Sequence, residues 1–147
     1  VDDVLAGDTF WEFGAPSVVG PATANSGVNC FGTNLAATYD VDANIWLRSP
    51  EIDLTTAGGA TLNYASWRDI ELMFDKGTVS VLNAVDDSVL AVVQADIEGS
   101  SAGWEQVSGP IPAAALGNVI KLEFRFESDE FQNFIGWYLD DVLVTVP

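Results

Sequence analysis

The chain has 147 residues, the usual size of one folded domain, and 48% of them are hydrophobic. Its 22 acidic residues far outnumber five Lys and Arg residues, and the net charge of −17 argues against nucleic acid or an anionic membrane as partner, because phosphate binding needs clustered basic side chains. His is absent, which excludes His-based catalytic triads and zinc sites.

Alternation of apolar and polar residues predicts short strands along most of the chain. The predicted strands cover residues 9–13, 30–35, 44–48, 61–69, 77–85, 88–94, 104–108, 119–127 and 137–146. Turn-forming residues separate them, and residues 111–116 favour one short helical turn. Parallel strands would need long crossovers that the pattern lacks. The sequence therefore predicts an all-β fold, a two-sheet antiparallel jelly-roll β-sandwich of about nine strands, as one domain over residues 1–147.

The clearest predicted strand covers residues 119–127. Its alternate apolar side chains should face the core, and they are Ile120, Leu122, Phe124 and Phe126. The charged residues between them should face solvent and form cross-strand pairs. The segment 14–29 is long and rich in small polar residues, and loops of that length are usually functional or strapped down. No apolar run is long enough for membrane insertion.

An acidic pair stands inside the last predicted strand, between apolar residues on both sides: Asp140 and Asp141. Strand alternation should point one of them toward the interior, where a carboxylate is costly unless it is hydrogen-bonded, paired or bound to a cation. Because basic residues are scarce, we expect a calcium ion, whose flexible shell accepts carboxylate, amide and carbonyl oxygens. The alternative is that this carboxylate caps backbone N–H groups or pairs with Arg48, Arg68 or Arg125.

A second acidic group lies in the middle of the chain and consists of Asp69, Glu71 and Asp75. These residues could form another cation site. They lack the glycine and terminal Glu spacing of an EF-hand loop, so a solvated turn between two strands is the favoured interpretation.

Catalysis would have to rest on paired carboxylates, and the sequence places no two of them across a substrate, so we expect no enzyme activity. The five Trp residues could stack on sugar rings, but at least three should fill the core. Phe131, Asn133 and Phe134 fall in a predicted loop, where exposed aromatic and amide side chains are typical of ligand binding. Cys30 has no intrachain partner and should be a small buried hydrophobe.

Several short motifs follow one another along the chain in an order typical of one protein family. Among them are Trp11-Glu12-Phe13-Gly14, Gly32-Thr33-Asn34-Leu35, Leu62-Asn63-Tyr64-Ala65-Ser66-Trp67 and Gly136-Trp137-Tyr138-Leu139-Asp140-Asp141-Val142. Over nearly the whole chain, this order resembles the MAM-like jelly-roll domain of bacterial secreted proteins, including the accessory domain of immune inhibitor A-type metalloproteases. The resemblance implies that Glu12 and carbonyls of the loop from Gly32 to Asn34 join Asp140 or Asp141 around the calcium ion. Animal MAM domains carry disulfides, which the single Cys30 cannot form, so receptor-type adhesion is not transferred.

The resemblance implies a non-catalytic accessory or interaction module of a larger secreted or cell-surface protein, stabilised by structural calcium. Its first partner would be the rest of the parent polypeptide. The alternative is a carbohydrate-binding module that brings a polysaccharide-degrading enzyme to its substrate, with a glycan or cell-surface polymer as partner. Exposed aromatic side chains would favour this alternative.

Overall fold

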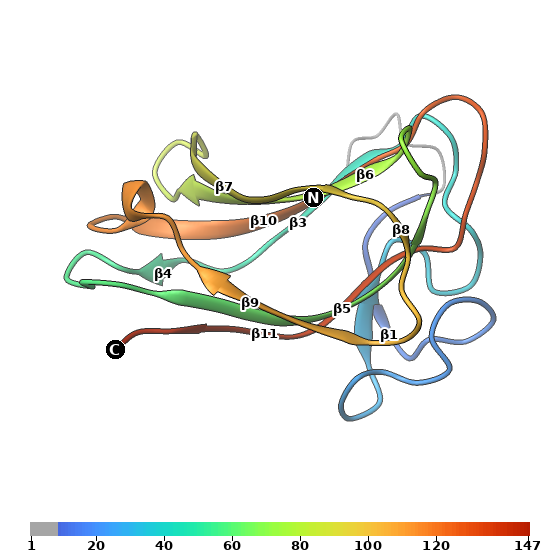
Figure 1. Cartoon of the computed structure of the whole chain (residues 1–147), viewed down its shortest axis with the longest axis horizontal. Coiled ribbons are helices and arrows are strands. Elements are labelled where there is room, and N and C mark those ends of the chain that lie inside the picture. The colour runs from blue at the N-terminus through green and yellow to red at the C-terminus, as the bar shows by residue number, and fades with distance from the viewer. Residues whose placement is uncertain (1–8) are drawn as a thin grey trace.

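Two antiparallel sheets pack face to face in the computed structural model, which describes residues 9–147 (Figure 1). One sheet has the order β1-β2-β11-β5-β8, with β9 also on β5; the other has the order β3-β10-β6-β7, with β4 also on β10. The strands are β1 (Glu12–Gly14), β2 (Cys30–Gly32), β3 (Asn44–Arg48), β4 (Ile52–Asp53), β5 (Thr61–Ile70), β6 (Lys76–Asn83), β7 (Val89–Ile97), β8 (Gly99–Ser100), β9 (Glu105–Pro110), β10 (Val119–Glu127) and β11 (Gly136–Thr145). The predicted jelly-roll sandwich is confirmed.

Each of the predicted strands overlaps a strand of the structure, although several bounds differ. β2 ends at Gly32, earlier than predicted, and β7 continues to Ile97. Sequence reasoning missed β4 and β8 because strands of two residues carry no periodicity. The predicted helical turn is the 3₁₀ helix η1 (Ala113–Ala115). Within residues 9–147, no helix is long and apolar enough to cross a membrane.

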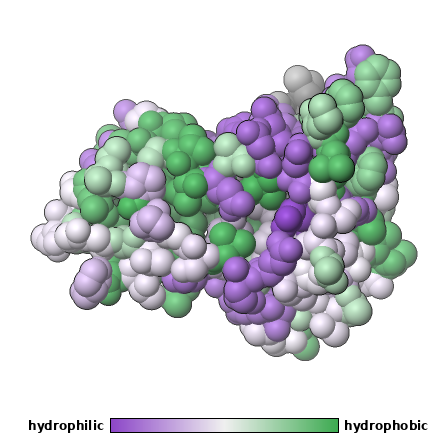
Figure 2. Space-filling view, in the orientation of Figure 1, coloured by the Kyte–Doolittle hydropathy of each residue, from purple (hydrophilic) through white to green (hydrophobic). Residues whose placement is uncertain are grey.

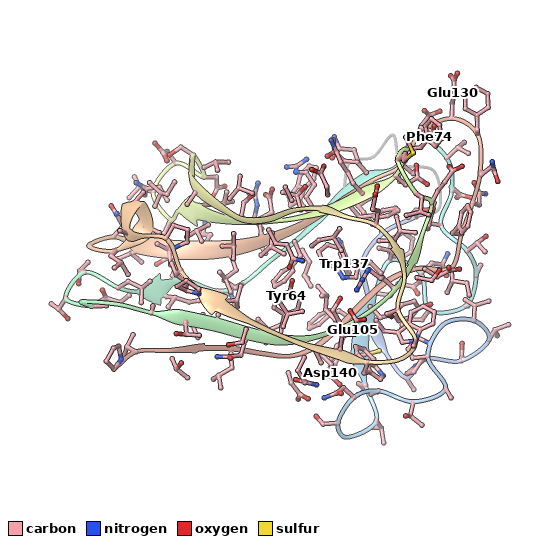
Figure 3. All side chains as sticks on the ribbon, viewed as in Figure 1. Tyr64, Phe74, Glu105, Glu130, Trp137 and Asp140 are labelled. Carbon is pink, nitrogen blue, oxygen red and sulfur yellow. The ribbon has the colours of Figure 1, made fainter. Side chains whose placement is uncertain are left out.

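The inner faces of the two sheets form the main core. The four predicted core residues of β10 are each exposed by 2% or less. In β11, Trp137 is fully buried and packs edge-on against the rings of Trp11 and Phe124 (Figure 3). Its indole N–H donates to the hydroxyl of Ser66 at 3.0 Å. At Gly77 of β6, a Cβ atom would lie 2.7 Å from the Trp137 ring, so this close approach requires glycine.

The outer face of β10 carries the predicted charge pairs. Arg48 and Arg125 both bind Glu123, at 2.7 and 3.0 Å, and both guanidinium groups lie over the ring of Trp46. Asp87, from the β6–β7 turn, accepts a second bond from Arg48. The prediction of a fully solvated face was wrong for Glu123, which is only 4% exposed because the two arginines cover it.

Hydrogen bonds fasten the long connection between β1 and β2 to neighbouring parts of the chain. Of the two predicted alternatives, a functional loop or a fastened one, the fastened loop is confirmed. The hydroxyl of Ser17 donates to the carbonyl of Leu35 at 3.0 Å. The indole N–H of Trp104 donates to the carbonyl of Thr23 at 2.9 Å. These bonds satisfy polar groups of a segment that has no regular structure of its own between the two strands.

Candidate metal centre

Three carboxyl groups meet where the β5–β6 and β10–β11 connections lie side by side. Glu71 and Asp75 flank the turn after β5, and Asp129 follows β10. Within the part of the chain that the structure describes, these three form the group of acidic side chains that could hold a metal ion, with one oxygen from each within 4.8 Å of the others. Figure 3 places Phe74, from the same turn, and Glu130 at this end of the sandwich.

Asp75 ties the two connections together. It is fully buried. Its Oδ2 accepts a hydrogen bond from the hydroxyl of Tyr39 at 2.6 Å, and its Oδ1 accepts one from the backbone N–H of Asp129 at 2.7 Å. The Tyr39 oxygen in turn accepts the backbone N–H of Glu71 at 3.2 Å. Both oxygens of Asp75 are therefore held by groups that are distant in sequence.

Of the three acids, Glu71 has the least favourable electrostatic environment. Its side chain is buried, with the residue 7% exposed, and its Oε2 has no hydrogen-bond partner among the residues that the structure describes. Among residues 9–147, the ion pairs include none of the three acids. Burial and the charges of Asp75 and Asp129 raise the pKa of Glu71, and burial also raises the pKa of Asp75. The cluster could hold a metal ion, which would supply the positive charge that its surroundings lack.

The sequence-based interpretation of this region as a solvated turn was wrong for Glu71 and Asp75, which are both buried. The physical reason is the distance in sequence to their neighbours: Tyr39 lies 36 residues before Asp75, and Asp129 lies 54 residues after it. Local spacing cannot show such contacts. Asp69 stands apart from the cluster and accepts a hydrogen bond from the hydroxyl of Ser100.

The predicted pair Asp140 and Asp141 lies at a β-bulge, where the register of β11 against β5 shifts before Leu143. Asp141 has a φ of 50°, and strand alternation is broken there. The prediction that one carboxylate points inward was therefore wrong: Asp140 is half-buried and Asp141 is exposed. Binding of calcium by this pair stays a prediction.

Hydrogen bonds from the β1–β2 connection reach both of these carboxylates. Asp141 accepts the side-chain amide of Asn25 at 2.7 Å and the hydroxyl of Ser26 at 2.6 Å, and these bonds lower its pKa. Asp140 accepts the backbone N–H of Ser26 at 3.0 Å. The pair thus fastens this connection to β11. Asp140 caps a backbone N–H group, which is the alternative to calcium binding that the sequence left open.

The other predicted calcium ligands hold the neighbouring loop. Glu12 accepts the backbone N–H of Leu35 at 2.6 Å, and the carbonyl of Asn34 accepts the hydroxyl of Tyr138 at 2.8 Å. Gly32 pairs with Glu12 on one side and with Tyr138 on the other. A Cβ atom at Gly32 would lie 2.8 Å from the Tyr138 ring. Their role as metal ligands stays a prediction.

The predicted ligand-binding loop divides into exposed and packed residues. Phe131 is 73% exposed, and Asn133 is exposed as well. Phe134 packs against the main core, and its carbonyl accepts the backbone N–H of Tyr39. Figure 2 shows hydrophobic and hydrophilic residues side by side at the end where the β10–β11 connection lies. Of the Trp residues expected to fill the core, Trp137 is fully buried, whereas Trp11, Trp67 and Trp104 are partly buried and pack against the two core clusters.

The fold is a jelly-roll β-sandwich, and solved structures of an adhesin domain and of a carbohydrate-binding module share it. The K1 cleaved adhesin domain of Lys-gingipain from Porphyromonas gingivalis W83 superimposes with a TM-score of 0.62 at 18% identity, covering 100% of this chain and 89% of that chain. TmCBM61, solved in complex with β-1,4-galactotriose, gives a TM-score of 0.63 at 14% identity and coverages of 100% and 86%. At these identities the likeness shows the fold alone.

In sequence, the chain is homologous to a segment of Bacillopeptidase F from Bacillus subtilis (strain 168), with 36% identity over 136 residues. The match covers 92% of this chain but 9% of that protein, so the chain spans about a tenth of its relative. No protein-family model matches the chain. The MAM-like assignment therefore stays a prediction.

Proposed function

We propose that the chain is a non-catalytic accessory module of a larger secreted or cell-surface protein, and that Glu71, Asp75 and Asp129 hold a structural calcium ion in it. Homology to a small segment of a large protein supports an accessory role. The structural likeness to an adhesin domain and to a carbohydrate-binding module is in keeping with a module that is not itself an enzyme. The parent polypeptide is the first partner in this proposal.

One observation carries the calcium proposal: the buried Oε2 of Glu71 finds no hydrogen-bond partner within residues 9–147. An unpaired carboxylate oxygen in the interior, beside two further acids, is costly unless a cation neutralises it. Calcium fits a site of carboxylate oxygens because it tolerates a flexible shell of about six to eight oxygens, whereas magnesium demands near-ideal octahedral geometry. Such an ion would link the β5–β6 turn to the β10–β11 connection and stabilise the fold.

Calcium is expected to raise the melting temperature of the domain, because an ion that binds only the folded state stabilises it by mass action. For a dissociation constant of about 10⁻⁴ M, as in many extracellular modules, about 10 mM calcium would add about 2.7 kcal/mol. For a domain of this size, that corresponds to about 5 to 10 °C. The measurement is thermal unfolding by circular dichroism with calcium, with magnesium, and with a chelator.

Two matched variants locate the site. Asp129→Asn should remove most of the calcium-induced rise, and the fold should survive because Asp129 is only half-buried and its carboxylate accepts the N–H of an exposed residue, Phe131. Asp141→Asn should keep the rise. Loss of the rise in Asp141→Asn alone would move the ion to the acidic pair of β11. Absence of any rise in the unaltered domain would refute the calcium proposal.

Carbohydrate binding is the alternative function, and exposed aromatic side chains favour it. Phe131 and Phe74 are 73% and 63% exposed at the same end of the sandwich, and aromatic faces pack well on sugar rings. We expect any glycan binding in an oligosaccharide array to be weakened at least about tenfold by Phe131→Ala, a loss of about 1.4 kcal/mol. Phe13→Ala is the control, since Phe13 is 64% exposed in β1. Equal binding by all three proteins would exclude this site.

A further inference from the structure

The last strand has an edge that no other strand covers in the part of the chain described. β11 pairs with β2 only through Tyr138 and Leu139. Beyond the bulge, Leu143, Val144 and Thr145 pair with β5, and no strand among residues 9–147 lies on their other side. In the facing sheet, β3 and β4 likewise pair with β10 alone. The two sheets therefore leave free edges, with unpaired backbone donors and acceptors.

An apolar pocket of about 340 Å³ lies between these two edges. Its lining includes Phe31 from β2, Leu47 from β3, Ile52 from β4, and Val142 and Val144 from β11. Leu143 does not line it, as expected for a strand whose successive side chains alternate between faces. A strand added to β11 would thus place every second side chain over the pocket.

Beyond its bulge, the edge of β11 lacks the charged side chains that proteins normally place on such strands. Residues 142–147 read Val-Leu-Val-Thr-Val-Pro, without a charged residue, in a chain whose net charge is −17. Val142, Leu143 and Val146 are 38%, 55% and 56% exposed. Natural edge strands usually carry charged side chains or bulges that prevent pairing. The bulge here precedes Leu143, so it leaves the following residues open to a further strand.

We propose that this edge binds an extended segment of a partner polypeptide by β-strand addition, with apolar residues toward the pocket and basic residues toward solvent. The unpaired backbone groups of β11 match another peptide backbone, which alternates donors and acceptors at the same spacing. The apolar lining selects the inward side chains. The net charge of −17 attracts Lys and Arg on the outward face, and it repels a second copy of this chain.

A fluorescent peptide of about eight residues, alternating Val and Lys, is the probe for this proposal. Two control peptides have the same sequence with N-methyl groups on alternate residues, one control for each register. At physiological ionic strength, fluorescence anisotropy should give saturable binding to the unaltered domain. At least one N-methylated peptide should bind about tenfold or more weakly, because it cannot donate hydrogen bonds to the edge.

Two protein variants separate strand addition from simple charge attraction. Val144→Lys places a charge toward the pocket and should weaken binding about tenfold or more, whereas Leu143→Lys adds the same charge one residue away on the other face and should change binding much less. If Val144→Lys lowers the melting temperature too far, the N-methylated peptides still decide the question on the unaltered domain.

Three results would overturn the proposal. The first is the absence of peptide binding. The second is equal affinity for the N-methylated peptides and for both Lys variants, which would reduce the interaction to charge attraction. The third is self-association in sedimentation velocity that Val144→Lys abolishes, which would make a second copy the occupant of the edge. None of these measurements depends on calcium, so their outcome is independent of the proposed metal centre.

Discussion

Glu71→Gln is expected to stabilise the domain in a chelator and to remove most of its stabilisation by calcium. Without a cation, the buried Glu71 carboxylate has an oxygen with no hydrogen-bond partner in the described part of the chain and lies beside two other acids, so its replacement removes a penalty. Leaving a buried polar group unsatisfied costs about 1 to 3 kcal/mol, and a charged group costs more. In calcium, the amide supplies a neutral ligand in place of an anion, so most of the stabilisation by the ion is lost.

Urea unfolding of the unaltered domain and the variant, each with calcium and with a chelator, measures both the gain in stability in the chelator and the loss of stabilisation by calcium. Glu130→Gln is the matched control: it removes the same charge at the same end of the sandwich, but from an exposed residue. The control should change stability little under either condition. A Glu71→Gln variant that is less stable than the unaltered domain in the chelator would contradict the electrostatic account of the cluster.

Trp137→Ala is expected to lower the free energy of unfolding by about 3 to 5 kcal/mol. The indole is fully buried between the two sheets, against Trp11 and Phe124, and the glycine at position 77 leaves no side chain that could fill the resulting cavity. The hydroxyl of Ser66 also loses the N–H that donates to it. For a domain of this size, the loss corresponds to a fall in melting temperature of about 6 to 20 °C.

Denaturant unfolding followed by far-ultraviolet circular dichroism checks this prediction. Trp104→Ala is the comparison, since Trp104 is only partly buried, beside the smaller core cluster. Its indole N–H donates to a carbonyl of the β1–β2 connection, so its loss should cost less than half as much. Equal losses in the two variants would mean that the main core is not organised around Trp137.

Periodicity was sufficient to predict the sandwich because strands such as β10 bury one face more than the other. In β10, the alternation of Ile120, Leu122, Phe124 and Phe126 with charged residues identifies the core face without any tertiary information. The same rule failed at Asp140 and Asp141, where one bulge breaks the alternation and neither residue is fully buried. A bulge of this kind leaves no clear signature in a single sequence.

The metal centre was only partly predictable. Glu71 and Asp75 were recognised as an acidic group, but their burial depends on Tyr39, which reaches them from another connection. Asp129 belongs to an ordinary polar stretch after β10, and its sequence context gives no sign of a site. One local feature could have raised suspicion: the turn between Glu71 and Asp75 is apolar, since it reads Leu-Met-Phe, which is unusual for a solvated turn.

The cluster on the outer face of β10 gives the module an uneven distribution of charge. Three of its five basic residues, Arg48, Lys121 and Arg125, gather there, and their acidic partners within residues 9–147 are Asp87 and Glu123. This face is close to electrically balanced, and the rest of the surface carries essentially all of the net charge of −17. The field of the molecule is therefore directional: an approaching anionic surface meets the least repulsion over β10, which sets a preferred orientation before any contact is made.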